Sequence, residues 1–251
     1  MNLQLTLRLA LNDFRSRYAG SKLGIIWAYA SPMVMVLIYW FVYTVALGGT
    51  SIDGVPYFLW LICGIIPWFF FSDSVNGATT CYADYRFLVR KVQFKADSLP
   101  CVRVLSALFI HLGLLLVSEI ILALNGVLSV GQLLVVLWVA GGFFFVLGLG
   151  RIFSIWSTFL RDISYGVQTV IQLGFWITPV FWNDADLPGR LGRISSLNPV
   201  SVLVKGYRMA LLYGTLPDIK DIIYFFGVTI IVCVAGELVT KKYGKTLADR
   251  I

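Results

Sequence analysis

The stretch PCVRVLSALFIHLGLLLVSEIILALNGVLSVGQLLVVLWVAGGFFFVLGLGRIFSIWST, residues 100–158, decides the fold. It contains two apolar runs, 100–124 and 132–158, separated by the short break Asn125–Gly131. A helix needs about 20 apolar residues to cross the hydrocarbon core of a bilayer. Because that core offers the backbone no hydrogen-bond partners, such runs fold as helices. The stretch therefore predicts two membrane-spanning helices joined by a tight turn.

The composition extends this interpretation to the whole chain. Of the 251 residues, 59% are hydrophobic and 13% are charged, whereas soluble domains carry about 25% charged residues. The mean hydropathy is +0.84. A soluble chain with so few charges could not cover its surface with polar groups, so we expect an integral membrane protein. The four cysteines have neither zinc nor disulfide spacing, and no metal site is predicted.

Six apolar stretches are long enough to cross the bilayer, which predicts an all-α membrane protein with a single transmembrane domain over residues 1–251. The predicted spans are 25–47, 57–79, 100–124, 132–158, 163–182 and 219–240. Most of the 20 Lys and Arg residues lie on one side of these spans, so the positive-inside rule predicts that both termini are cytoplasmic. The basic residues predicted on the opposite side are Arg190, Arg193, Lys205, Arg208 and Lys220.

Two further segments are expected not to cross. Residues 3–20 predict a basic amphipathic helix, which is typical of a helix that lies along the membrane interface. Residues 183–218 are too long for a turn and too polar for a span. Their apolar run is shorter than a span, which predicts a re-entrant or interfacial hairpin on the outer face. The apolar face of the first helix is formed by Leu7, Leu11, Phe14 and Tyr18.

The predicted cytoplasmic segment 82–95 combines basic residues with aromatic and aliphatic ones. This pattern suits an interfacial loop that follows the charge rule, and it also suits a short helix that docks a cytoplasmic partner. In a docking helix the apolar side chains act as anchors and the charges set the register. The candidate docking residues are Tyr85, Arg86, Phe87, Arg90, Lys91 and Phe94.

Aromatic residues are abundant in the first, second and fifth predicted spans. Trp and Tyr gather at the headgroups of any membrane protein. Rings deeper in the first and fifth spans also suit a path for sugar, because an aromatic face with a polar edge packs against sugar rings. Both interpretations remain open for the candidate path residues, which are Tyr39, Tyr43, Trp176 and Phe181.

His111 and Glu119 lie near the same face of the third predicted span. Ionisable groups inside a membrane are costly and often functional, so a proton relay is one interpretation of this pair. The other is a pair whose polar groups are satisfied by neighbouring helices. No Ser-His-Asp or zinc pattern accompanies them, and the chain is not expected to be an enzyme.

Several short motifs occur along nearly the whole chain. They are RSRYAGSKLGIIW at 15–27 followed by Ser31-Pro32, VPYF at 55–58, GIIPW at 64–68, FLRD at 159–162, Thr178-Pro179, Asn198-Pro199 and Tyr207-Arg208. Together they resemble the permeases of type-2 ABC exporters, and more narrowly those that export polysaccharides such as O-antigen, capsule or teichoic acid. One departure is Gln93-Phe94-Lys95, where the family commonly has Phe-Pro, and it leaves the end of the docking helix open.

This resemblance implies a homodimer of six-helix subunits in a bacterial inner membrane, with two copies of a separate ATP-binding subunit. ATP and magnesium would be used by that partner, so the chain itself is expected to bind no cofactor and no nucleic acid. The implied substrate is an undecaprenyl-linked polysaccharide, with O-antigen as the preferred glycan. Its diphosphate is anionic, and we expect Arg15, Arg17 and Lys22 to bind it at the cytoplasmic entrance.

Other functions remain open at this point. Within the same family, the substrate could instead be teichoic acid, capsule or a drug-like lipid. A stand-alone secondary transporter would be expected to show internal repeats and broken polar helices near the midplane of the membrane, and the sequence contains no convincing repeat. A membrane-bound enzyme acting on a lipid-linked sugar would need a cluster of carboxylates or histidines at the interface.

Overall fold

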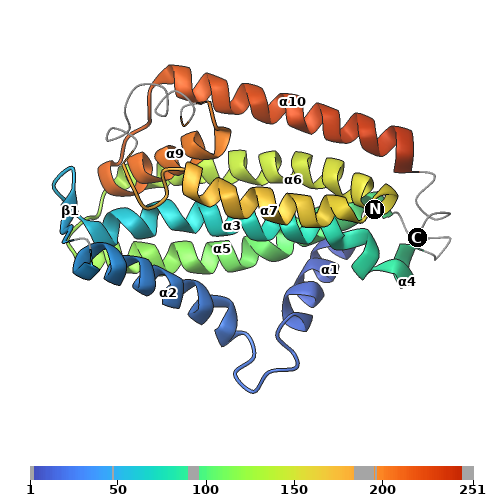
Figure 1. Cartoon of the computed structure of the whole chain (residues 1–251), viewed down its shortest axis with the longest axis horizontal. Coiled ribbons are helices and arrows are strands. Elements are labelled where there is room, and N and C mark those ends of the chain that lie inside the picture. Colours follow the sequence, from blue (N-terminus) through green and yellow to red (C-terminus); the bar gives the residue numbers. More distant parts are fainter. Residues whose placement is uncertain (1–2, 47, 90–95, 184–194, 196, 245–251) are drawn as a thin grey trace.

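The computed structural model describes residues 3–46, 48–89, 96–183, 195 and 197–244. These residues form an elongated bundle in which the long helices run close to one common axis (Figure 1). The long helices are α2 (Ile26–Phe41), α3 (Tyr57–Asp84), α5 (Leu99–Leu124), α6 (Val135–Phe159), α7 (Asp162–Ile177) and α10 (Ile219–Tyr243). The shorter elements are α1 (Leu3–Ser16), the π-helical turn η1 (Val42–Ala46), α4 (Arg86–Val89), the 3-10 turns η2 (Ala96–Ser98) and η3 (Val130–Leu134), α9 (Pro199–Tyr213), and the strands β1 (Ser51–Ile52) and β2 (Val55–Pro56).

The bundle has two ends, which are named here after the elements found there (Figure 1). The β1 end is where α3 begins, and the α4 end is where α3 finishes. Helix α1 packs against α5 near the α4 end, whereas α2 runs toward the β1 end. The loop between α1 and α2 projects away from the rest of the bundle.

Among the described residues, five helical segments are long and apolar enough to cross a membrane: Ile26–Ala46, Tyr57–Asp84, Ala96–Leu124, Val130–Phe159 and Ile219–Tyr243. They correspond to the predicted first, second, third, fourth and sixth spans. The protein is therefore a multi-pass, mainly helical membrane protein.

The predicted end of the fifth span, 163–182, is wrong, because the helix α7 already stops at Ile177. Thr178 already has an extended backbone, and the next residue is Pro179. A residue before proline is driven out of the helical region by steric clash, which ends the helix. With 16 residues, α7 is about 24 Å long at 1.5 Å per residue.

Other predicted boundaries also shift. Helix α1 ends at Ser16 rather than at residue 20, and α3 continues to Asp84, so the predicted docking segment begins inside α3. The prediction of helices alone missed the antiparallel pair β1–β2. Its turn residues, Asp53 and Gly54, have φ angles of 50° and 78°, and Asp-Gly is a strong hairpin signal.

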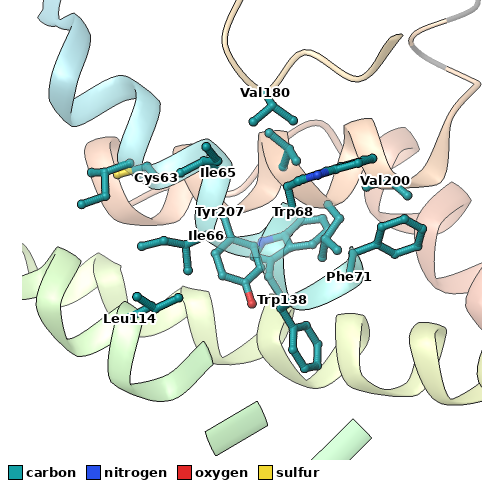
Figure 2. Packing of buried hydrophobic residues seen from close by; sticks show 14 of the residues in the cluster. Cys63, Ile65, Ile66, Trp68, Phe71, Leu114, Trp138, Val180, Val200 and Tyr207 are labelled. Carbon is teal, nitrogen blue, oxygen red and sulfur yellow. The ribbon is translucent and has the colours of Figure 1, made fainter. Parts of the chain in front are cut away.

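Helix α3 forms the centre of the core. In its most apolar window 72% of the residues are buried, against 11% for the segment that begins with α2. Figure 2 shows Ile66 of α3 close to side chains from α5, α6 and α9, including Leu114, Trp138 and Tyr207. A Cβ atom at Gly206 would overlap the Trp138 ring, so this glycine allows α9 to approach α6.

The predicted outer hairpin 183–218 includes residues outside the described part of the chain, and its remainder contains α9. Asn198 begins α9 by accepting a hydrogen bond from the backbone N–H of Val200 at 3.0 Å, and Pro199 occupies the first turn. Gly214 ends the helix with a φ angle of 63°. Most of α9 is buried against α3 and its neighbours, so this segment is part of the core.

Arg208 of α9, a basic residue of the predicted outer hairpin 183–218, is buried. Its side chain is 8% exposed. Nη1 donates to the carbonyl of Pro179 at 2.6 Å, Nη2 to Val180 at 2.5 Å and Nε to Trp60 at 3.3 Å. The guanidinium carbon lies 3.2 Å from the centroid of the Trp60 ring. Gly64 leaves room for this arrangement, because a Cβ atom there would overlap the guanidinium.

Replacing Arg208 should therefore destabilise the β1 end. The variant Arg208→Met leaves buried carbonyls without their donor, and we expect a loss of about 3 kcal/mol or more in the free energy of unfolding. The matched control is Lys205→Met in the same helix, which removes a partly exposed ion pair with Asp221 and should cost at most about 1 kcal/mol. Thermal unfolding in detergent measures both, and equal effects would contradict this role for Arg208.

Candidate functional site

The carboxylate of Asp13 joins three elements at the α4 end. Its side chain is 3% exposed and accepts hydrogen bonds from Arg17 Nε at 3.2 Å and Arg103 Nη1 at 2.9 Å. The hydroxyl of Tyr85, the residue between α3 and α4, also donates to Asp13. Asp13 belongs to α1 and Arg103 to α5, so one buried carboxylate connects α1, α5 and the start of α4.

Two more carboxylates extend this group. Nη1 of Arg17 donates to both carboxylate oxygens of Asp73 in α3, at 3.1 and 2.9 Å. Nη2 of Arg103 pairs with Asp84, the last residue of α3. Two arginines and three aspartates give the group a net charge of −1. These six residues, Asp13, Arg17, Asp73, Asp84, Tyr85 and Arg103, are called the Asp13 cluster below.

Two members of the Asp13 cluster, Tyr85 and Arg17, have a pKa that lies above its ordinary value. Burial raises the pKa of the Tyr85 hydroxyl above its ordinary value, and the hydrogen bond to Asp13 raises it further. Tyr85 therefore remains a neutral donor. For Arg17, burial acts to lower the pKa, but Asp73 and Asp13 raise it above its ordinary value, so this side chain stays charged.

The three basic residues predicted at the entrance are not equivalent. Arg15 and Lys22 are exposed, whereas Arg17 is largely buried and bound by two carboxylates. Arg15 lines an open hollow of about 520 Å³ between the end of α1 and the start of α2, together with Tyr18 and Tyr29. The structure thus places one predicted side chain in the Asp13 cluster and leaves two on the surface.

The predicted docking residues divide in a similar way. Tyr85 belongs to the Asp13 cluster, while Phe87 in α4 is 62% exposed. Arg86 lines a groove of about 350 Å³ with Arg161, the residue that precedes α7. Three more candidates lie outside the described residues: Arg90, Lys91 and Phe94.

The structure groups three of the four candidate path aromatics between α2 and α7. The ring of Phe181 lies 6.4 Å from Tyr39 and 5.2 Å from Trp176, measured between centroids. Phe175, which the sequence analysis did not select, lies within 6 Å of all three of these rings. The fourth candidate, Tyr43, instead stacks on Tyr57 at 3.6 Å, where the first span meets the start of α3.

His111 is paired inside the bundle. Its Nε2 lies 2.8 Å from the hydroxyl of Tyr207 in α9, and its ring lies 4.7 Å from that of Phe70. This contact connects α5 to α9 and gives one of the two ring nitrogens a partner on a neighbouring helix. Glu119 does not join this contact.

Sequence reasoning missed Asp13 entirely. It is the only acidic residue in the basic amphipathic segment, and it stands four residues before Arg17. An acid and a base at that spacing on a helix form an ion pair, and this signal was present in the sequence. Its pairing with Arg103 joins residues 90 positions apart, which only the tertiary structure reveals.

Comparisons with known proteins agree with this architecture. Residues 4–212 match the family described as ABC-2 type transporter. The chain is 27% identical over 252 residues to the O-antigen export system permease protein RfbA of Myxococcus xanthus, an alignment that covers 98% of this chain and 95% of that protein. It is 26% identical over 243 residues to a protein of the same description from Klebsiella pneumoniae, covering 94% and 91% of the two chains. Because the family match spans well over half of its length, the chain belongs to the ABC-2 type transporter family.

Proposed function

We propose that this chain is the permease subunit of a transporter that exports O-antigen as an undecaprenyl-linked polysaccharide, driven by a separate ATP-binding subunit. The observation that carries the proposal is the similarity to O-antigen export permeases over nearly the whole chain. Those relatives favour O-antigen over teichoic acid, capsule or a drug-like lipid, and the family match favours an ATP-driven transporter over a secondary transporter. ATP and magnesium would then be bound by the partner.

We further propose that the α4 end faces the cytoplasm of a bacterium and that the chain crosses the inner membrane six times. The cluster of basic residues around this end, including Arg15, Lys22 and Arg86, supports this orientation. In this arrangement both termini are cytoplasmic, α1 lies along the interface and α9 enters the membrane from the outer side without crossing. Helix α7 and the non-helical residues after it would form the fifth span.

The chain would act as a homodimer, with the sugar path between α2 and α7 of the two copies. Helix α2 is the least buried of the apolar segments, and α7 exposes Val170, Leu173 and Trp176. The aromatic group of Tyr39, Trp176 and Phe181 lies where these two helices meet. One bundle is narrow for a polymer, and two facing bundles would enclose a wider path, with Tyr43 near its outer end.

At the α4 end, we propose that α4 docks the ATP-binding subunit. Phe87 offers an exposed apolar anchor next to the basic Arg86, and Arg90, Lys91 and Phe94 follow in sequence. Tyr85 would pass a displacement of α4 to α1 and α5, because its hydroxyl is bound to the carboxylate of Asp13.

The diphosphate of the lipid would bind at Arg15 and Lys22. Both side chains are exposed, and Arg15 lines the hollow between α1 and α2. The contribution of Arg17 would be to hold this segment against α3 through Asp73, because its guanidinium is already bound by carboxylates. Exposed guanidinium and ammonium groups form charge-assisted hydrogen bonds with phosphate oxygens.

Loss of the chain should block export in the cell. Deleting it should leave undecaprenyl-linked polymer in the cytoplasm and remove the polymer from the surface. Extraction of lipid-linked glycan and labelling of the cell surface measure the two pools, and re-expression of the intact chain is the control. Normal surface polysaccharide in the deletion strain would refute the proposed function.

If α4 docks the ATP-binding subunit, Phe87→Ala should lower the affinity between the two subunits by about tenfold. An exposed aromatic anchor carries much of the binding energy of such an interface. Co-purification of the two subunits from detergent measures this. The control is Phe144→Ala, which truncates an exposed phenylalanine of α6 away from α4. If both variants retain the partner equally, α4 is not the docking element.

If Arg15 and Lys22 bind the diphosphate, the double variant Arg15→Gln, Lys22→Gln should have an affinity for a short prenyl diphosphate that is lower by about tenfold. The variant loses the charge-assisted hydrogen bonds to the phosphate oxygens. Thermal stability should not change, since both side chains are exposed. Lys220→Gln, a basic residue at the β1 end, serves as the control and should bind normally. Equal binding by the double variant and the control would contradict this site.

A further inference from the structure

A cavity of about 380 Å³ lies between α2, α3 and α5. It is separate from the aromatic group between α2 and α7 to which the sugar path is assigned above. Aromatic side chains line part of it, among them Trp27 of α2 and Phe69 of α3. Polar side chains line another part: Ser31 of α2 and Ser72, Asp73 and Asn76 of α3. Its size falls within the range of about 300–1,000 Å³ that small-molecule sites occupy.

These polar groups lie at a depth where lipid tails cannot satisfy them. Asp73 lies six residues before the cytoplasmic end of the predicted span 57–79, which is about 9 Å inside that end at 1.5 Å per residue. The amide of Asn76 reaches Ser72 Oγ only at 3.5 Å, which is a weak hydrogen bond. Polar groups at this depth require partners from protein, water or a ligand. A ligand that fills the cavity should therefore carry both donors and acceptors.

The carboxylate of Asp73, the charged group that lines the cavity, favours a neutral occupant over an anion. Asp73 presents a side chain that is 43% exposed, and the Asp13 cluster to which it belongs has a net charge of −1. A phosphate in the cavity would be repelled. A sugar ring is neutral, its hydroxyl groups pair with carboxylate, amide and serine oxygens, and its C–H face packs on aromatic rings.

The cavity is also adjacent to the proposed diphosphate site. Tyr18 lines both the cavity and the hollow that contains Arg15. In a lipid-linked glycan the first sugar is bonded directly to the diphosphate. A diphosphate held at Arg15 therefore places that sugar beside the cavity.

We propose that this cavity binds the first sugar of the lipid-linked glycan, next to its diphosphate. The inference rests on the proposed function and adds a sugar-binding subsite within each protomer, separate from the aromatic path between α2 and α7. Ser31, Ser72 and Asn76 would donate to or accept from the sugar hydroxyls, and Asp73 would accept from them. Trp27 would cover one face of the ring.

The test compares two probes on the complex of permease and ATP-binding subunit in lipid nanodiscs. One is a short prenyl diphosphate, and the other is the same lipid carrying a single hexose. The lipid that carries the hexose should bind about tenfold more tightly than the bare prenyl diphosphate. A gain of this size corresponds to about two net hydrogen bonds between the sugar and the cavity. Asn76→Leu should abolish this difference and leave the affinity for the bare prenyl diphosphate unchanged. Arg15→Gln should weaken both probes equally and keep the difference.

Two further variants control for folding and position. Ser72→Ala is a milder change in the same cavity and should reduce the tenfold difference even if Asn76→Leu does not fold. Asn125→Leu changes an exposed asparagine at the β1 end and should keep the full difference.

The outcomes separate the two proposals. Equal binding of both probes to the unaltered complex would overturn the sugar subsite and leave the diphosphate site standing. A difference that survives in both cavity variants would overturn it as well. Binding of neither probe would overturn the subsite together with the proposed substrate.

Discussion

The buried carboxylate of Asp13 is the constraint on which the α4 end depends. A buried charge is costly unless several donors satisfy it, and here the donors come from Arg17, from Arg103 in α5 and from Tyr85 at the start of α4. Any movement that separated these elements would expose the charge or leave it unpaired. The buried carboxylate therefore favours joint movement of the three elements, as the proposed coupling of α4 to α1 and α5 requires.

A buried charge of the opposite sign organises the β1 end. Arg208 binds backbone carbonyls of α3 and of the segment after α7. Helix α3 thus lies between two fixed charged groups, and it is also the most buried of the apolar segments. Helix α2 contributes no residue to the Asp13 cluster. It is the least buried of the apolar segments, which suits its proposed position beside the path of the polymer.

The sequence predicted those parts of the fold that follow from local patterns. Apolar stretches located five spans within a few residues, because the bilayer imposes their length. The fifth failed at Thr178-Pro179, where the apolar run continues but proline ends the helix. Arg208 was assigned to an outer loop, because nothing local shows that its charge is satisfied by carbonyls more than 25 residues away. For Asp13 the spacing of four to Arg17 was a local signal, but its pairing with Arg103 joins residues that are distant in sequence.

The site residues show how one short segment serves two purposes. Arg15 and Arg17 are two positions apart, and residues at that spacing point to different sides of a helical turn. One is bound into the Asp13 cluster and the other remains exposed beside the hollow between α1 and α2. The exposed arginine is thus carried on the same helix end that Asp13 ties to α4. In the proposed transporter, a ligand held at Arg15 and a partner docked on Phe87 would therefore act on elements that the same buried carboxylate joins.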